Sequence, residues 1–463
     1  MTAAASRGPL RRFVNRLEVD RAVFYALCLR VWQFVAGPIS MLLIGRFFSP
    51  DLQGYYFTFA SLVALQSFLE LGFQIVILNV SSHEWAHLQL DETGTIAGDA
   101  AARSRLASLA RLLLAWYGVA ALLFVIGVGP GGAWFLAQKA ADAVSWQAPW
   151  AVLVVLSAGM LWVLPFVVML DACGQMAVVN RYRLGQAVTA NLAVWACVLL
   201  GAGLWAAVAA AAVQLLGNLW LTAVRYRRFF RVVRQPPSGP RLRWRADLWP
   251  MQWRLAISGV ASYFAFALFT PVMFHYHGAA VAGQMGMTWQ LVTLLQAAAL
   301  AWVQARAPLF GRLVARHDYR ELDRVFFRLT GISWVVLVAG AVAAGLVVWG
   351  LGLIDFWLAR RLLGPLPTAL FLLAIVAYHF PNCQAYYVRA HKQEPLLVLS
   401  VVTSLLVGGA VWWFGGRDGP TAAAWAYLAI VVGVVCPWQT AIWWRCRRAH
   451  LPCPRLPHGT EDG

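Results

Sequence analysis

Long apolar stretches separated by short polar gaps constrain this chain more than any other feature of its sequence. A helix needs about 20 mostly apolar residues to cross the hydrocarbon core of a bilayer. Twelve stretches meet this requirement: 23–47, 55–79, 109–129, 149–171, 184–202, 204–224, 253–275, 280–304, 328–350, 367–388, 396–414 and 421–444. The sequence therefore predicts an all-α integral membrane protein with about twelve transmembrane helices.

The overall composition excludes a soluble globular protein. Of the 463 residues, 61% are hydrophobic and only 12% are charged, whereas a soluble domain carries about 25% charged residues. The first apolar stretch is too long for the core of a signal peptide and lacks a small-residue cleavage site, so we expect it to be retained as the first helix.

The basic residues define the expected orientation. The net charge is +18, but the arginines lie in short gaps between apolar stretches, which argues against nucleic acid as a partner. They concentrate in the N-terminal tail, in alternate connections and in the C-terminal tail, and such connections face the cytoplasm. We therefore expect both termini on the cytoplasmic side of a bacterial inner membrane. The basic residues on the opposite side are Arg46, Lys139, Arg360, Arg361 and Arg417.

An internal repeat divides the chain into two halves. We expect a six-helix half at 1–225, a basic cytoplasmic linker at 226–252, and a second six-helix half at 253–463. Two pairs of segments support the repeat: Gly54, Leu62, Val63 and Leu65 recur as Gly283, Leu291, Val292 and Leu294, and Trp220–Ala223 resembles Trp438–Ala441. Repeats of an even number of helices give two parallel halves, a layout that many transporters use.

The segment Arg46-Phe-Phe-Ser-Pro-Asp-Leu-Gln-Gly-Tyr-Tyr56, which continues to Leu71-Gly72, is the most specific motif. It resembles the polysaccharide-exporter (O-antigen flippase) branch of the multidrug/oligosaccharidyl-lipid/polysaccharide (MOP) transporter superfamily, as does Pro308–Asp318. Within this motif, Ser49 is expected to cap the second helix, with Pro50 in its first turn. The amphipathic segment Pro308–Arg328 is expected to lie on the membrane surface.

The resemblance implies a function and its partners. It implies a flippase, not an enzyme, that moves a polyprenyl-diphosphate-linked oligosaccharide to the outer leaflet by alternating access, for export of a surface polysaccharide such as O-antigen, lipopolysaccharide or exopolysaccharide. It also implies a fold like that of multidrug transporters, and no cofactor beyond a possible coupling cation, H⁺ or Na⁺. Membrane lipids and glycan-assembly proteins are possible partners.

Two charges inside the apolar stretches are candidate site residues. Arg30 and Glu70 are expected at a similar depth on neighbouring antiparallel helices. A charge within the bilayer is costly unless it has a partner or lies in a hydrated cavity. Arg30 would bind the diphosphate, and Glu70 would hold Arg30 or accept the coupling cation. The alternatives are a structural ion pair, or an Arg30 side chain that extends to the inner surface.

Polar residues within the helices are candidates to line a path for the sugar. They are Gln66, Asn191, Gln214, Asn218, Gln290, Gln296 and His379. The same amide groups also serve hydrogen bonding between helices, so each has a structural alternative.

One motif points to zinc chemistry. His83-Glu84-Trp85-Ala86-His87 matches the zinc-protease pattern, and Asp171 superficially resembles the further ligand of an intramembrane protease. The segment follows a complete span in a polar stretch, so we interpret the match as chance and expect neither a metal site nor a catalytic residue. The seven cysteines form no C-x-x-C pair, and we predict neither a disulfide nor a zinc site from them.

Other functions are possible. A cation-coupled multidrug or organic-cation antiporter of the same superfamily would need acidic residues in its cavity, and only Glu70 and Asp171 qualify. The lipid II flippase branch usually carries two further helices and several cavity arginines, and this sequence predicts neither. A glycan polymerase or ligase generally needs a sizeable outer loop, and the longest here spans only 130–148.

Overall fold

The structure is a computed structural model that describes residues 21–139, 144–234, 239–244, 249–391 and 395–450. The chain divides into two compact units, Met1–Val260 and Ala261–Gly463, here called unit 1 and unit 2. Each unit is described by itself. Within the described residues the chain is helical apart from its connections and one two-stranded sheet.

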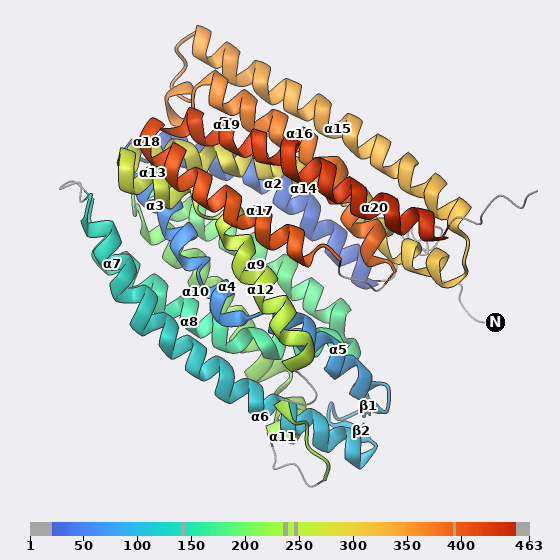
Figure 1. Ribbon diagram of the computed structural model, residues 1–463. Coiled ribbons are helices and arrows are strands. Elements are labelled where there is room, and N and C mark those ends of the chain that lie inside the picture. Colours follow the sequence, from blue (N-terminus) through green and yellow to red (C-terminus); the bar gives the residue numbers. More distant parts are fainter. Residues whose placement is uncertain (1–20, 140–143, 235–238, 245–248, 392–394, 451–463) are drawn as a thin grey trace, which may run out of the picture. The chain divides into compact units, whose positions relative to one another are not determined.

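Unit 1 is built from helices of very different length (Figure 1). Its helices are α2 (Arg21–Phe47), α3 (Pro50–Val63), α4 (Gln66–Glu70), α5 (Phe73–Trp85), α6 (Ala100–Leu123), α7 (Gly129–Ala137), α8 (Gln147–Leu170), α9 (Met176–Leu199), α10 (Trp205–Leu219) and α11 (Arg227–Arg234), with the strands β1 (Leu88–Leu90) and β2 (Ile96–Gly98). Three π-helical turns, Phe124–Val128, Asp171–Gln175 and Trp220–Arg225, continue α6, α8 and α10.

Unit 2 contains the longest helices of the chain. α12 (Trp249–Phe266) crosses the boundary between the units in sequence. It is followed by α13 (Phe269–His277), α14 (Ala279–Ala315), α15 (Tyr319–Leu353), α16 (Pro365–Arg389), α17 (Leu397–Ala410), α18 (Gly416–Asp418), α19 (Pro420–Ile430) and α20 (Cys436–His450). A short 3₁₀ turn, Ala359–Arg361, precedes α16.

The helices confirm the predicted membrane fold. Nine described helical stretches are long and apolar enough to cross a membrane, and the bent pair Pro50–Glu70 and Phe73–Trp85 makes ten. One of the nine, Gln147–Leu199, has 53 residues. Because it bends at Cys173 and Gly174, it supplies two spans, α8 and α9. The predicted span 253–275 corresponds to α12 and α13, so the described helices account for about twelve spans.

The second span differs from the prediction because it is broken. Its start is as predicted: Ser49 caps α3 by accepting a hydrogen bond from the Leu52 N–H at 3.1 Å, and Pro50 is the first helical residue. α3 ends at Val63, and the short helix α4 that follows it stops at Glu70, because Leu71 and Gly72 are both left-handed, with φ of 46° and 69°. The two parts of the span are bent by 48°. A continuous span over 55–79 is therefore wrong.

The connections between spans differ in the two units. In unit 1, α5 and α6 are joined by an antiparallel hairpin in which Leu88 pairs with Gly98 and Leu90 with Ile96. In unit 2, the predicted surface helix is instead the end of α14 and the start of α15, joined at residues 316–318. With 37 residues, α14 is about 55 Å long, which exceeds the bilayer core. The segment is therefore formed by two helices that meet at residues 316–318, and its placement on the membrane surface stays a prediction.

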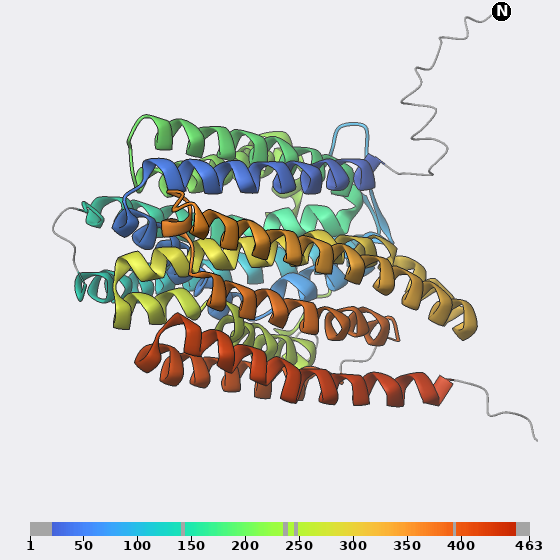
Figure 2. The ribbon, with the colours of Figure 1, turned by 90° about the horizontal axis from the view of Figure 1, so that it is seen from above.

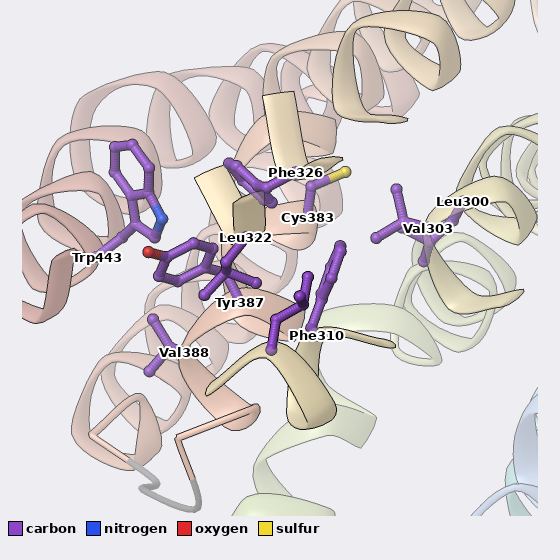
Figure 3. Close-up of a cluster of buried hydrophobic side chains, with 10 residues drawn as sticks. Leu300, Val303, Phe310, Leu322, Phe326, Cys383, Tyr387, Val388 and Trp443 are labelled. Carbon is purple, nitrogen blue, oxygen red and sulfur yellow. The ribbon is translucent and has the colours of Figure 1, made fainter. Parts of the chain in front are cut away.

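We call the end of each unit that carries the arginine-rich connections its basic end. In unit 1 the basic end includes the hairpin and α11. In unit 2 it includes the 316–318 connection, and there an apolar cluster from α14, α15, α16 and α20 packs around Phe326 (Figure 3). Asp323 accepts hydrogen bonds from the Tyr387 hydroxyl at 3.0 Å and the Arg447 guanidinium at 2.8 Å, which ties three of these helices together.

The described part of the predicted 226–252 linker is fixed to unit 1. Phe229 and Phe230 on α11 are buried, and their rings contact Trp85 and Phe166. Further along, the backbone N–H groups of Gly239 and Leu242 donate to the hydroxyls of Ser104 and Ser108 on α6.

Helices that are distant in sequence lie side by side within each unit. In unit 1, α9 packs between α2 and α10, and α8 packs against α6 and α10. In unit 2, α16 packs against α14, α15, α19 and α20, and these long helices run alongside one another in Figures 1 and 2. α16 is therefore the central helix of unit 2, which places His379 in its core.

Candidate functional site

Glu70 lies at the break in the second span, on the last residue of α4. Its carboxylate accepts a hydrogen bond of 2.5 Å from the Gln74 amide, on the other side of the break. Directly after the break, Phe73 is fully buried and packs on Trp116 and Tyr117 of α6, which fixes the position of α5. Gln66, the first residue of α4, is half-buried. The break thus gathers three polar side chains, of which only Gln66 and Glu70 were predicted.

Arg30 lies on α2 with an exposed side chain. It forms no ion pair with Glu70, whose polar partner is Gln74. The structure therefore does not contain the Arg30–Glu70 ion pair that was the structural alternative.

A pair of amides connects α9 and α10. The Gln186 amide donates to the Asn218 side-chain oxygen at 2.9 Å. The neighbouring Gly217 makes room for it, because a Cβ there would lie 2.3 Å from Gln186 Nε2. Gln214, one turn before Asn218, is half-buried. Asn191 instead donates to the Ala187 carbonyl of its own helix at 2.9 Å.

Asp171 lies in a buried network near the basic end of unit 1. Its carboxylate contacts Arg183 at 2.6 Å, and only 11% of the Asp171 side chain is exposed. Arg183 also donates to Asn180, whose amide donates to the Ala22 carbonyl on α2 at 3.1 Å. The charge of Asp171 is therefore balanced by Arg183 and serves to hold α2, α8 and α9 together.

His379 lies in the core of unit 2. Its Nε2 is 2.8 Å from the Ser333 hydroxyl on α15 and 3.6 Å from the Cys383 thiol one turn further along α16. Its Nδ1 has no hydrogen-bond partner among the described residues. In α14, Gln290 Oε1 is also buried without a partner in the described part of the chain, while Gln296 is half-buried.

Sequence reasoning missed several polar partners. These are Gln74, Gln186, Gln304, which donates to the Tyr386 hydroxyl, and Gln384, which donates to the Thr440 hydroxyl. All four lie within or at the ends of predicted spans. They would have been included if every glutamine and asparagine in the apolar stretches had been taken as a candidate.

The zinc-protease pattern has a structural use. α5 ends at Trp85, so His87 lies beyond the helix that carries His83. Glu84 is buried and binds Arg105 of α6 at 2.8 Å, while 79% of the His83 side chain is exposed. Glu84 therefore joins α5 to α6, and the pattern does not present two histidines and a free carboxylate on one helix face.

The hairpin between α5 and α6 carries a structured acidic turn. Asp91 accepts from the backbone N–H groups of Thr93 and Thr95 at 2.9 and 2.8 Å, and from both of their hydroxyls. These donors, with the Thr95 hydroxyl first, hold the pKa of Asp91 well below its usual range. Asp91 is thus a turn-forming residue.

Comparison with known proteins gives matches in structure alone. No family model matches the chain, and no curated sequence matches it. An inward-facing multidrug resistance MATE-family transporter of the MOP superfamily matches with a TM-score of 0.53 at 14% identity, over 92% of this chain and 96% of that one. The lipid II flippase MurJ, in an inward closed conformation, matches with a TM-score of 0.58 at 11% identity, over 93% and 94%. A mutant of the Vibrio cholerae MATE transporter VcmN matches with a TM-score of 0.54 at 13% identity, over 92% and 96%.

These matches, together with the described helices, define the class of protein. The chain is an all-α, multi-pass membrane protein with the fold of the MOP-superfamily transporters. Multidrug transporters and a lipid flippase share this fold, so the fold alone does not specify a substrate.

Proposed function

We propose that this protein is a flippase that moves a polyprenyl-diphosphate-linked oligosaccharide from the cytoplasmic to the outer leaflet. The proposal rests on how the two carboxylates within the predicted membrane spans are paired. Within the predicted spans these are Glu70 and Asp171, and Asp171 is neutralised by Arg183 at 2.6 Å. A single remaining carboxylate, together with the exposed Arg30 on α2, suits an anionic, sugar-bearing substrate better than an organic cation.

The other polar groups match the same substrate. A sugar head presents many hydroxyl groups, which amide side chains bind as both donors and acceptors. Gln66, Gln214, the Gln186–Asn218 pair and Gln290 supply such amides. The Arg30 guanidinium is suited to the diphosphate, because planar bidentate donors match phosphate geometry.

The broken second span gives the proposed transport cycle a point of bending. Irregular backbone within a membrane is tolerated where it is enclosed by protein or borders a hydrated cavity. Glu70, at the break, would accept the coupling cation, H⁺ or Na⁺, and Gln74 would respond to its charge. In this proposal the basic ends face the cytoplasm of a bacterium, and glycan-assembly enzymes supply the substrate.

A second candidate is a cation-coupled multidrug antiporter. The observation in its favour is that Glu70 makes no ion pair within the described residues, so it could meet a cationic drug. Catalysis as a metalloprotease is less favoured, since the residues of the zinc-protease pattern are engaged or separated as described above. Catalysis as a glycan polymerase or ligase is less favoured because the longest predicted outer loop spans only 130–148.

Deletion of the gene in the native host tests the proposal. We expect a complete lipid-linked repeat unit to accumulate on the cytoplasmic leaflet, with its sidedness measured by glycosidase accessibility in oriented membrane vesicles. Wild type and Arg46→Ala, which removes an arginine from the other end of the same helix, should restore export, and Arg30→Ala should not. Intermediates on the outer leaflet, or changed sensitivity to cationic drugs without accumulation, would contradict the proposal.

A further inference from the structure

A second basic site lies outside the residues assigned to transport, at the end of the sixth span. Arg225 is the last residue of the π-helical turn that ends this span, Arg227, Arg228 and Arg231 lie on α11 directly after it, and all four side chains are exposed. None of the four forms an ion pair with a carboxylate in the described part of the chain.

The arginines surround two neighbouring cavities. One, of about 380 Å³, is lined by Arg225, Arg227, Arg228, Gln175 and the turn of the β1–β2 hairpin. The other, of about 290 Å³, is lined by Thr222, Ala223, Arg227, Phe230 and Arg231. Arg227 borders both, so the two cavities form one basic site within unit 1.

The site is held in place by buried groups. The Tyr226 hydroxyl donates to Gln175 at 2.8 Å, and Arg228 donates to the Thr93 carbonyl of the hairpin at 2.8 Å. Phe229 and Phe230 are buried beneath the arginines. The guanidinium groups therefore project from a packed base that joins three connections.

The acidic residues at the rim leave positive charge in excess. Asp91 and Glu92 both line the larger cavity. The Asp91 carboxylate is occupied by the donors of its own turn, and Glu92 is exposed. The larger cavity therefore carries three guanidinium groups against two carboxylates, and Arg231 at the smaller cavity adds a further positive charge.

An apolar strip leads into the site from the membrane-spanning part of the helix. Leu216, Trp220 and Val224 recur at four-residue spacing and are 65%, 46% and 55% exposed. Residues at this spacing share one helix face. Val224 itself lines the larger cavity. A molecule with acyl chains along this strip would place its polar head among the arginines.

From these features we infer that the Arg225–Arg231 site binds the phosphate head group of an anionic phospholipid, in the leaflet at the basic end of unit 1. Basic pockets next to the ends of membrane helices attract such head groups, and arginine forks match phosphate oxygens. This inference does not depend on the proposed transport function.

Native mass spectrometry of the full-length protein, purified in a phospholipid-free detergent, tests the inference. Phosphatidylglycerol or phosphatidylcholine is added, and the bound fraction is measured. We expect wild type to prefer phosphatidylglycerol, and the triple variant Arg225→Gln/Arg227→Gln/Arg228→Gln to bind it roughly a hundredfold more weakly. The matched control is Arg312→Gln/Arg316→Gln/Arg320→Gln, which removes three exposed arginines from the basic end of unit 2 and should retain the preference.

A second variant tests the same site in case the triple variant misfolds. Val224→Glu places a carboxylate between the strip and the arginines at an exposed position, and should abolish the preference with an unchanged thermal unfolding midpoint. The inference is overturned if the triple variant binds like wild type, or if both triple variants lose binding equally. It is also overturned if undecaprenyl diphosphate binds at this site while phosphatidylglycerol does not.

Discussion

The second span of unit 1 and its counterpart in unit 2 begin alike and then diverge. The repeat that relates Gly54–Leu65 to Gly283–Leu294 places Leu71 and Gly72 opposite Leu300 and Ala301. At that point the first span breaks, while α14 continues through 37 helical residues. Glycine adopts the left-handed conformation readily, and alanine does so only at a cost of about 1–2 kcal/mol. A glycine in place of an alanine thus accompanies the break.

The side chains around the break in unit 1 are also more polar than their counterparts in unit 2. Gln66, Glu70 and Gln74 correspond, by the same repeat, to Leu295, Ala299 and Val303. Val303 is fully buried in the apolar cluster of unit 2 (Figure 3). The two copies of the repeat therefore differ at these three positions, which are polar around the break in unit 1 and apolar in the continuous helix of unit 2.

The largest expected effect concerns the charge at the break. Glu70→Ala should lower transport by about tenfold or more, because a hydrogen bond to a charged group contributes about 1.5–3 kcal/mol. Transport of lipid-linked oligosaccharide into proteoliposomes measures it. The control is Thr293→Ala on α14, whose hydroxyl bonds only carbonyls of its own helix. Equal activity of the two variants would remove the functional contrast between the spans.

The next effect concerns the backbone. Gly72→Ala should lower transport about fivefold, because the left-handed conformation then costs about 1 kcal/mol more and favours a straighter span. The reciprocal change Ala301→Gly should instead lower thermal stability, since glycine weakens a helix interior by about 1 kcal/mol relative to alanine. A stability loss without a transport loss in Gly72→Ala would show that bending is not used.

A smaller effect is expected where α9 meets α10. Gly217→Ala should displace the Gln186 amide, and polar contacts between membrane helices contribute about 0.6 kcal/mol on average. Because Gly→Ala in a helix interior also gains about 1 kcal/mol, the expected result is an unfolding midpoint about 2 °C below that of a second Gly→Ala variant without this contact. The control on the same pair of helices is Gly185→Ala, where a Cβ would meet nothing within 4 Å. If the two variants unfold at the same temperature, the amide pair does not stabilise unit 1.

The smallest effect is local and depends on pH. The native pKa of Asp91 is lowered by its hydrogen bonds, so its contribution to hairpin stability is complete above the unfolded pKa of about 3.9. It is lost as the pH falls through the native pKa. Hydrogen exchange of the peptide 88–98, corrected for intrinsic rates, should show protection at neutral pH that declines only in strong acid. Asp91→Ala should remove this protection at neutral pH, and Glu92→Ala should not.

Much of the fold was readable from the sequence because membrane solvation imposes simple rules. Apolar length located the spans, and the Ser49-Pro50 pair located the start of α3, as the structure confirms. The break at Leu71 and the bend at Gly174 were not predicted. A single glycine costs a helix only about 1 kcal/mol, so its conformation depends on neighbours such as Phe73 packing on Trp116.

The candidate site was less predictable than the fold. Arg30 and Glu70 stood out because charges are rare in spans, but their separation in the structure depends on helix rotation and on Gln74 as a competing partner. The Gln186–Asn218 pair requires contact between α9 and α10 and the space at Gly217, neither of which a single sequence specifies. Where a polar group finds its partner is decided by packing.

The most direct test of the central claim is reconstitution of the purified full-length protein into liposomes with a fluorescent polyprenyl-diphosphate oligosaccharide. A membrane-impermeant quencher reports how fast the labelled head group crosses the bilayer. The account predicts rapid crossing with wild type, slow crossing with Arg30→Ala and Glu70→Ala, and no exchange of a labelled organic cation. Cation exchange by wild type without crossing of the lipid-linked sugar would contradict the account and would show that the protein is a drug transporter.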